Sequence, residues 1–173
     1  MSWGHLHLLL NHVPVIGTLL GLLLLLVAFG RKNEELKKVT LGLFVLIALV
    51  TVPVYLTGEP AEEMVENIPG VSEAMIERHE NAALFSLIAV EVGGIIALAG
   101  LLLFGRKKGL GNLLAIVTLA FSVVTGGLMG WTANLGGQIR HTEISSGVGS
   151  QSQPETDKSG RARKDSEKER EEH

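Results

Sequence analysis

Four long apolar runs constrain this chain more than any other feature of its sequence. Each run is about 18 to 24 residues long, enough for an α-helix to cross a hydrocarbon core of roughly 30 Å. Unlike the helices of a soluble bundle, these runs carry no regular polar stripe. The sequence therefore predicts an all-α fold, a four-helix transmembrane bundle. Its helices are expected at about residues 6–29, 39–57, 82–104 and 110–133.

The last part of the chain differs in composition from the rest. Beyond residue 146 it is first rich in serine, glycine and glutamine and then densely charged. Such a segment cannot bury enough apolar surface to offset the entropy of ordering it. We expect a membrane domain over residues 1–146 and a disordered charged tail over residues 147–173.

Lysine and arginine are distributed unevenly among the connections between the apolar runs. The connections after the first and third runs hold seven of them, whereas the connection between the second and third runs holds only Arg78. Short connections rich in lysine and arginine stay in the cytoplasm. This predicts a multi-pass protein of the bacterial inner membrane, with both termini and the 57–81 connection in the periplasm.

The 57–81 connection is acidic and carries helix signals. Pro60 followed by Glu62 and Glu63 is typical of a helix start, and Ser72 is a typical N-cap residue. We expect a short periplasmic helix, ended by Pro69 and Gly70, and a second helix that continues into the third apolar run.

Histidines gather where the predicted helices meet the periplasm. Of the six in the chain, His5, His7 and His12 begin the first helix, His79 precedes the third run and His141 follows the fourth. Imidazole is a common metal ligand and is costly inside lipid without a partner. The topology therefore predicts that residues distant in sequence meet at one rim of the bundle.

Two kinds of cofactor fit this rim. Haem b can be held by histidines from two helices of a bundle, and His12 with His79 is the preferred axial pair, with His5 and His141 as further candidates. The rival is a divalent transition metal in an imidazole and carboxylate shell. Its candidate ligands are His5, His7, His12, Glu59, Glu63, His79, Glu80 and His141. The chain has no cysteine, which excludes thiolate sites, iron–sulfur clusters and haem attached through Cys-x-x-Cys-His.

Two local features bear on these hypotheses. Pro14 favours a kink close to His12, because it removes a backbone donor and frees the carbonyl of Leu10. One helix face also has small residues at seven-residue spacing, which a neighbouring helix or a flat ligand can approach. This face comprises His79, Ser86, Gly93 and Gly100.

The alternative interpretation of the rim is an ordinary membrane interface, where histidines and acids lie at headgroup level beside an aromatic belt. That belt would comprise Trp3, Tyr55 and Trp131.

Glu91 lies near the middle of the third predicted span. An ionised carboxylate is expensive there, so we expect Glu91 to be protonated and hydrogen-bonded. Ser122 and Thr125 of the fourth helix lie at a similar depth. Glu91 is either a proton or cation relay or a neutral packed acid.

Four motifs, HLHLLLNHVP, TGEPAEE, RHE and GGQIRHTE, resemble a bacterial domain-of-unknown-function family of four-helix inner-membrane proteins. The resemblance covers about residues 3 to 144 and implies respiratory redox chemistry, because related sets are sometimes joined to c-type cytochrome domains. It implies His5, His7, His12, Glu59, His79, Glu80 and His141 as motif positions.

The expected function is thus that of a membrane electron-transfer or respiratory accessory subunit without independent enzymatic activity. The expected partners are the lipid bilayer and redox membrane-complex subunits or c-type cytochromes, and no nucleic acid. The alternatives are a metal-ion handling or transport protein, and a structural membrane subunit without a cofactor.

Overall fold

The computed structural model describes residues 2–66, 68 and 71–140, all of whose regular elements are helices. In chain order these are α1 (Trp3–Leu10), α2 (His12–Gly30), α3 (Glu34–Leu56), α4 (Gly58–Glu62), α5 (Glu73–Phe104) and α6 (Lys108–Arg140). The predicted all-α fold is confirmed. The predicted disorder of the tail and the candidate His141 lie outside the described residues.

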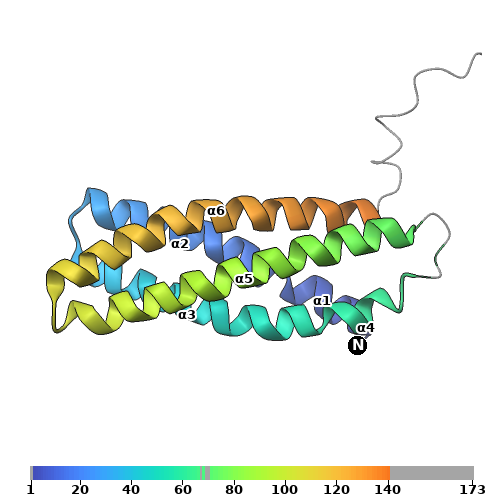
Figure 1. Ribbon diagram of the computed structural model, residues 1–173, viewed down its shortest axis with the longest axis horizontal. Coiled ribbons are helices and arrows are strands. Elements are labelled where there is room, and N and C mark those ends of the chain that lie inside the picture. Colours follow the sequence, from blue (N-terminus) through green and yellow to red (C-terminus); the bar gives the residue numbers. More distant parts are fainter. Residues whose placement is uncertain (1, 67, 69–70, 141–173) are drawn as a thin grey trace, which may run out of the picture. The chain divides into compact units, whose positions relative to one another are not determined.

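Four long helical segments form the bundle. Helix α2 packs on α3, α3 on α5, α5 on α6 and α6 on α2, so the four close into a ring. Figure 1 shows the α2–α3 and α5–α6 connections together at one end, with α1 and α4 at the other. The two basic connections therefore share one end, here called the basic end, and the histidine-bearing helix ends share the opposite end, here called the outer rim.

The surface of the bundle is apolar around its circumference. Leu23, Leu49, Ile95 and Leu102 are each at least 60% exposed, although large aliphatic side chains normally avoid water. Four segments are long and apolar enough to cross a membrane: Trp3–Gly30, Glu34–Leu56, Glu73–Phe104 and Lys108–Ile139. The exposed faces are therefore those of an integral multi-pass membrane protein, as the sequence predicts.

Small residues set the distance between neighbouring helices. A Cβ atom added to Gly21 of α2 would lie 2.8 Å from the ring of Phe44, and one added to Gly94 of α5 would lie 2.5 Å from the Cβ of Ala48. Both contacts are too short for a real side chain, so α3 approaches α2 and α5 as closely as glycine allows. Van der Waals packing of this kind is the main source of association between helices in lipid.

Several helices begin earlier or end later than the apolar runs predict. Ser72 caps α5, because its hydroxyl accepts a hydrogen bond from the backbone N–H of Met75, and the helix continues into the third apolar run, as predicted. Asn33 caps α3 in the same way through Leu36 N–H. Each such cap is worth about 1 kcal/mol of helix stability. The helices therefore extend past the hydrocarbon core on polar residues.

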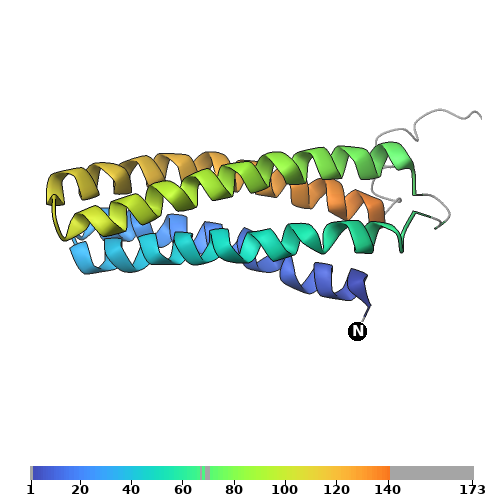
Figure 2. The ribbon, with the colours of Figure 1, turned by 60° about the horizontal axis from the view of Figure 1, so that its bottom comes forward.

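The first predicted helix is divided in two. Helix α1 ends at Leu10 and α2 begins at His12, with Asn11 as the turn between them. Pro14 stands in the first turn of α2, where its missing N–H costs least. The expected kink near His12 is thus present, and it lets α1 leave the ring and pack on α4 (Figure 2).

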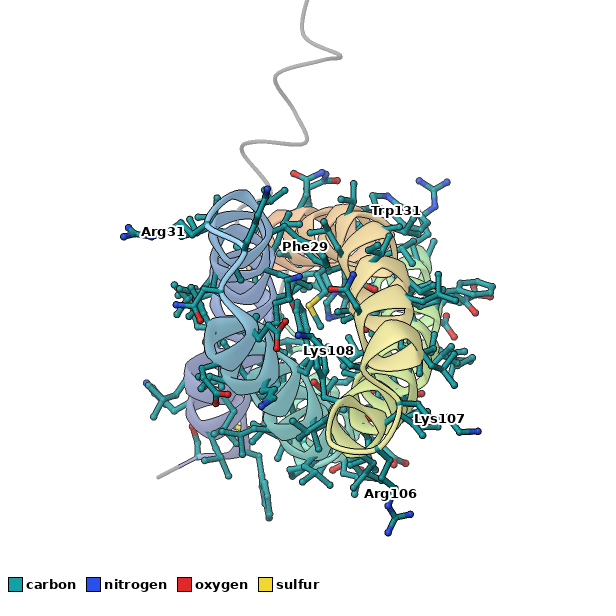
Figure 3. The ribbon with its side chains drawn as sticks, turned by 90° about the vertical axis from the view of Figure 1, so that its left-hand side faces the viewer. Phe29, Arg31, Arg106, Lys107, Lys108 and Trp131 are labelled. Atoms are coloured by element: carbon teal, nitrogen blue, oxygen red, sulfur yellow. The ribbon has the colours of Figure 1, made fainter. Side chains whose placement is uncertain are left out.

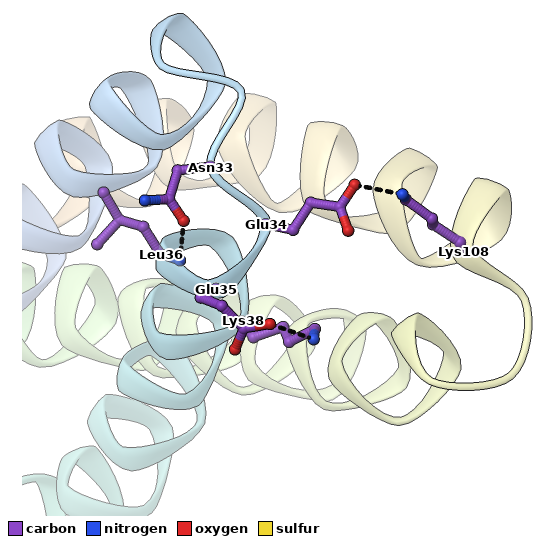
Figure 4. Close-up of polar contacts among 6 residues, drawn as sticks. All are labelled: Asn33, Glu34, Glu35, Leu36, Lys38 and Lys108. Atoms are coloured by element: carbon purple, nitrogen blue, oxygen red, sulfur yellow. Dashed lines mark hydrogen bonds and ion pairs between the residues drawn. The ribbon is translucent and has the colours of Figure 1, made fainter.

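Ion pairs and a buried lysine hold the basic end together. Glu34 of α3 binds Lys108 of α6 at 2.6 Å, and Glu35 binds Lys38 at 2.8 Å within α3 (Figure 4). Lys37 is only 7% exposed; its ammonium group donates to Asn112 Oδ1 at 2.6 Å and lies 4.2 Å from the centre of the Phe29 ring.

Three further basic side chains at this end point away from the bundle. Figure 3 looks onto the basic end and shows Arg31, Arg106 and Lys107 directed outward, whereas Lys108 turns toward the middle. Lysine and arginine side chains directed outward at one end of the bundle can contact lipid headgroups.

Candidate functional site

His7 of α1 is half-buried against the end of α3. Its Nδ1 lies 3.2 Å from the carbonyl oxygen of Val54 and 3.1 Å from the hydroxyl oxygen of Thr57, whose own proton is donated to the same carbonyl at 2.7 Å. A carbonyl only accepts, so the proton of a neutral His7 ring is on Nδ1. The lone pair on Nε2 is then free to bind a metal or a proton.

His79 of α5 repeats this arrangement against α6. Its Nδ1 lies 3.1 Å from the carbonyl oxygen of Thr132, so its Nε2 is again the free nitrogen of the neutral ring. A Cβ atom added to Gly136 would lie only 3.0 Å from Cε1 of His79. The absence of a side chain at Gly136 therefore lets the imidazole lie directly on the α6 backbone.

Thr132 is the centre of the polar contacts between α5 and α6 at this rim. Its hydroxyl lies 2.8 Å from that of Ser86 and also donates to the carbonyl oxygen of Leu128 at 3.0 Å. Ser86 follows His79 by seven residues, so one face of α5 supplies both contacts. Farther along this face Gly93 meets Phe121 and Gly100 meets Leu114. The small-residue face of α5 thus accommodates a neighbouring helix, α6.

His7 and His79 stand at similar distances along their helices from the basic end. At 1.5 Å per residue, His7 is about 35 Å from the basic end along α1 and α2, and His79 about 38 Å along α5. Tyr55 and Trp131 have exposed aromatic side chains. By the same calculation they lie about 32 to 35 Å from the basic end, where they mark the membrane interface at the opposite end.

His12 and His5 are placed differently. His12 is exposed, and its Nδ1 lies 2.6 Å from the carbonyl oxygen of Leu8 in α1, to which it can donate. It stands about 27 Å from the basic end, roughly one and a half turns deeper than His7. His5 is also exposed, with its Nδ1 2.8 Å from the hydroxyl of Ser2. Because α1 is helical here, His5 and His7 point to different sides and cannot chelate one ion together.

The acidic side chains of the rim contribute one pair that the sequence analysis did not single out. Glu62 at the end of α4 faces Glu80 of α5; burial, the adjoining Glu80 carboxyl and the charges of Glu66 and Glu59 raise the pKa of Glu62 above its usual range. Glu59, Glu63 and Glu80 are exposed. The rim thus combines two imidazoles with a local excess of carboxylates.

These residues converge without forming a preassembled metal shell. Within residues 2–66, 68 and 71–140, no group of three or more histidine or acidic side chains is arranged to hold a metal ion. His7 and His79 nevertheless provide a pair of neutral imidazoles. Each ring has its Nδ1 held by a backbone carbonyl, which is common among histidines that bind metals.

The intramembrane polar residues divide into two groups. Ser122 and Thr125 donate to carbonyls of their own helix, those of Leu119 and Phe121, and are buried. Glu91 is half-buried, and its Oε1 is enclosed without a hydrogen-bond partner among the described residues. The expected hydrogen bond of Glu91 is therefore not formed by this oxygen within the described residues.

The fold and the rim together define an integral multi-pass membrane protein with polar groups concentrated at the ends of its spans. No protein-family model, no curated protein and no solved structure matches the chain.

Proposed function

We propose that this protein is a bacterial inner-membrane subunit that binds haem b at its outer rim through His7 and His79 and serves electron transfer. The observation that carries the proposal is the matched environment of the two rings. They come from different helices at the outer rim, and each directs Nδ1 to a backbone carbonyl.

The histidine pair meets the requirement of haem with the fewest additional assumptions. The porphyrin supplies four nitrogens, so iron needs only two axial ligands from the protein. The two Nε2 atoms must then approach to about 4 Å, twice a metal–nitrogen distance of about 2 Å.

The chain's own residues would prepare this site in two ways. Thr57 and the Val54 carbonyl orient His7, and the Thr132 carbonyl with Gly136 orients His79. A hydrogen bond from Nδ1–H to a carbonyl also makes the ring a more basic ligand through Nε2. A bound haem would supply reversible one-electron transfer at the membrane surface. The resemblance to four-helix inner-membrane proteins and the distribution of basic residues support the assignment to the inner membrane with a periplasmic rim.

A second candidate is metal-ion handling at the same rim. The observation that favours it is the facing pair of Glu62 and Glu80, since neighbouring carboxylates attract divalent cations. A non-haem ion would use one or both histidines and these carboxylates, with His141 as a further candidate.

One preparation separates these functions. The protein is expressed with ample haem precursor and iron, purified in detergent, and examined by absorption spectroscopy and elemental analysis. A Soret band with one iron per chain supports haem; stoichiometric metal without that band supports the second candidate. If neither signal is found, both proposals are contradicted and a structural membrane subunit remains. His7→Ala should lose the band, while His12→Ala is the control that keeps it; the reverse result would restore His12 as the axial partner of His79.

A further inference from the structure

The same four residues, Phe-Gly-Arg-Lys, occur twice in the chain, and both copies lie at the basic end. One copy covers residues 29–32, where α2 ends, and the other covers residues 104–107, where α5 ends. Both of these spans run from the outer rim to the basic end, so each copy turns the chain at that end (Figure 1). We call the two copies the FGRK corners. Their recurrence at equivalent positions of the bundle indicates a shared role.

The two corners are built alike. The aromatic residue of each belongs to the bundle interior: Phe104 is buried, and Phe29 packs against the core. The three residues that follow are exposed in both corners. Gly30 and Gly105 have no positive φ, and a Cβ atom added to either would meet no atom within 4 Å, so the fold itself does not require glycine there. An exposed backbone without a side chain allows close approach by a group from outside the protein.

Each corner ends in two cations that the protein does not neutralise. The two acids of this end, Glu34 and Glu35, bind lysines outside the corners (Figure 4). Within the described part of the chain, no ion pair involves the arginine or the lysine of either corner. Lys32 also has a φ of 52°, in the left-handed region that favours glycine, so a lysine there lowers the stability of the turn. The corners therefore hold the uncompensated positive charge of the basic end.

The direction of these side chains points to lipid as their partner. In the view onto the basic end, Arg31, Arg106 and Lys107 extend sideways from the perimeter of the bundle (Figure 3). Four residues before each arginine stands a large aliphatic side chain, Val27 or Leu102, that is 47% or 65% exposed. A cation beside exposed aliphatic surface matches a phospholipid, whose phosphate lies next to its acyl chains. An acidic protein or a nucleic acid would instead approach the end of the bundle along its axis.

We propose that the FGRK corners are binding sites for anionic phospholipids, with one lipid phosphate at each corner and the acyl chains on the aliphatic surface of α2 or α5. Arginine binds phosphate through two parallel N–H donors, and the adjoining lysine adds a second positive charge. Two cations favour a headgroup with a net negative charge over phosphatidylcholine, whose choline cation offsets its phosphate. These sites lie at the end opposite the histidines, so they do not depend on any cofactor at the outer rim.

Native mass spectrometry tests this proposal, because it counts the lipids bound to each chain. The full-length protein in detergent micelles is titrated in parallel with phosphatidylglycerol and with phosphatidylcholine. In the first two binding steps we expect phosphatidylglycerol to bind at least about fivefold more tightly, which corresponds to roughly 1 kcal/mol for a basic residue near an anionic surface. Equal binding of the two lipids would overturn the proposal.

Neutralising one corner at a time tests the equivalence of the two copies. The double variant Arg31→Gln, Lys32→Gln should keep one tightly bound phosphatidylglycerol, and so should Arg106→Gln, Lys107→Gln. The quadruple variant should bind the two lipids alike. The other three lysines of this end remain in it, so the end stays basic. If one double variant lost both lipids and the other lost none, the assignment of one lipid to each corner would be wrong.

The matched control removes the same number of positive charges elsewhere in the chain and should keep both lipids. It carries the substitutions Lys158→Gln, Arg161→Gln, Arg163→Gln and Lys164→Gln. Circular dichroism establishes that each variant has the helix content of the wild type. A preference for phosphatidylglycerol that survives in the folded quadruple corner variant, or that disappears in the control, would contradict lipid binding at the corners.

Discussion

The Nδ1 atom of His79 lies 3.1 Å from the carbonyl oxygen of Thr132, and this contact fixes the imidazole on the backbone of a neighbouring helix. It leaves Nε2 of the neutral ring without a proton, and the same holds for His7 against Val54. Two equivalent nitrogens thus become available at one rim of the bundle, from helices that the sequence separates by some seventy residues.

The contact between His79 and α6 depends on Gly136. A methyl group at this position would lie 3.0 Å from Cε1 of His79, so Gly136→Ala should displace the ring and cost about 1 to 3 kcal/mol of unfolding free energy. Gly137→Ala is the matched control, because its added Cβ meets no atom within 4 Å and alanine favours a helix. Denaturant unfolding in detergent micelles measures both. Equal destabilisation of the two variants would contradict the close approach of His79 to α6.

Helices α3 and α5 should be sensitive to one methyl group at their crossing. Gly94→Ala would bring its Cβ to 2.5 Å from that of Ala48, and neither atom can rotate away, so the helices must separate. We expect a loss of about 3 kcal/mol, at the upper end for overpacking of a core. Gly42→Ala in α3 serves as the control, since nothing lies within 4 Å of its added Cβ. Thermal unfolding followed by circular dichroism distinguishes them; a wild-type melting temperature for Gly94→Ala would refute this packing.

Most of the fold could be predicted from the sequence, whereas the partners at the rim could not. Apolar runs specify the spans because a membrane demands about twenty apolar residues per helix. The Ser72 cap and the helix that continues from it into the third run also follow from the sequence, and α5 confirms both. The sequence favours His12 over His7, whereas the contact of His7 with Thr57 depends on α1 leaving the ring at Asn11.

Lys37 illustrates the same limit. In the sequence it is one of several lysines in a basic connection, yet it is buried between Phe29 and Asn112. Whether a lysine near a helix start faces outward depends on the rotation of that helix about its axis. The convergence of His7, His79, Glu62 and Glu80, by contrast, follows from topology alone, because alternate helix ends must return to one side.

The buried ammonium group of Lys37 yields a third prediction. Asn112→Ala removes its hydrogen-bond acceptor and should cost about 1.5 to 3 kcal/mol, the range for bonds to charged groups. Lys38→Ala breaks only the exposed pair with Glu35 and should cost less than about 1 kcal/mol. Urea unfolding in micelles measures both variants. The double variant Lys37→Met, Asn112→Leu should recover stability, because it removes the buried charge together with its partner; failure to recover would contradict this explanation.

The contact between Glu62 of α4 and Glu80 of α5 should weaken as pH rises. The pKa of Glu62 in the folded protein is raised by burial and by Glu80, Glu66 and Glu59, so protonation favours the folded arrangement. The stabilisation is therefore complete below the ordinary glutamate value and is lost as pH rises through the raised pKa. Hydrogen exchange of residues 58–63, corrected for intrinsic rates, should show falling protection over this range. Glu62→Gln should abolish the change; the same pH profile in that variant would assign it to another group.

Low-temperature electron paramagnetic resonance of the oxidised protein purified with haem tests the central claim most directly. Two axial imidazoles give low-spin ferric haem, so the wild-type protein should show a low-spin signal. His7→Ala and His79→Ala should each convert it to a high-spin signal or lose the haem, whereas His5→Ala should leave it unchanged. A low-spin signal that survives both His7→Ala and His79→Ala, or a wild-type protein that binds no haem, would contradict the account.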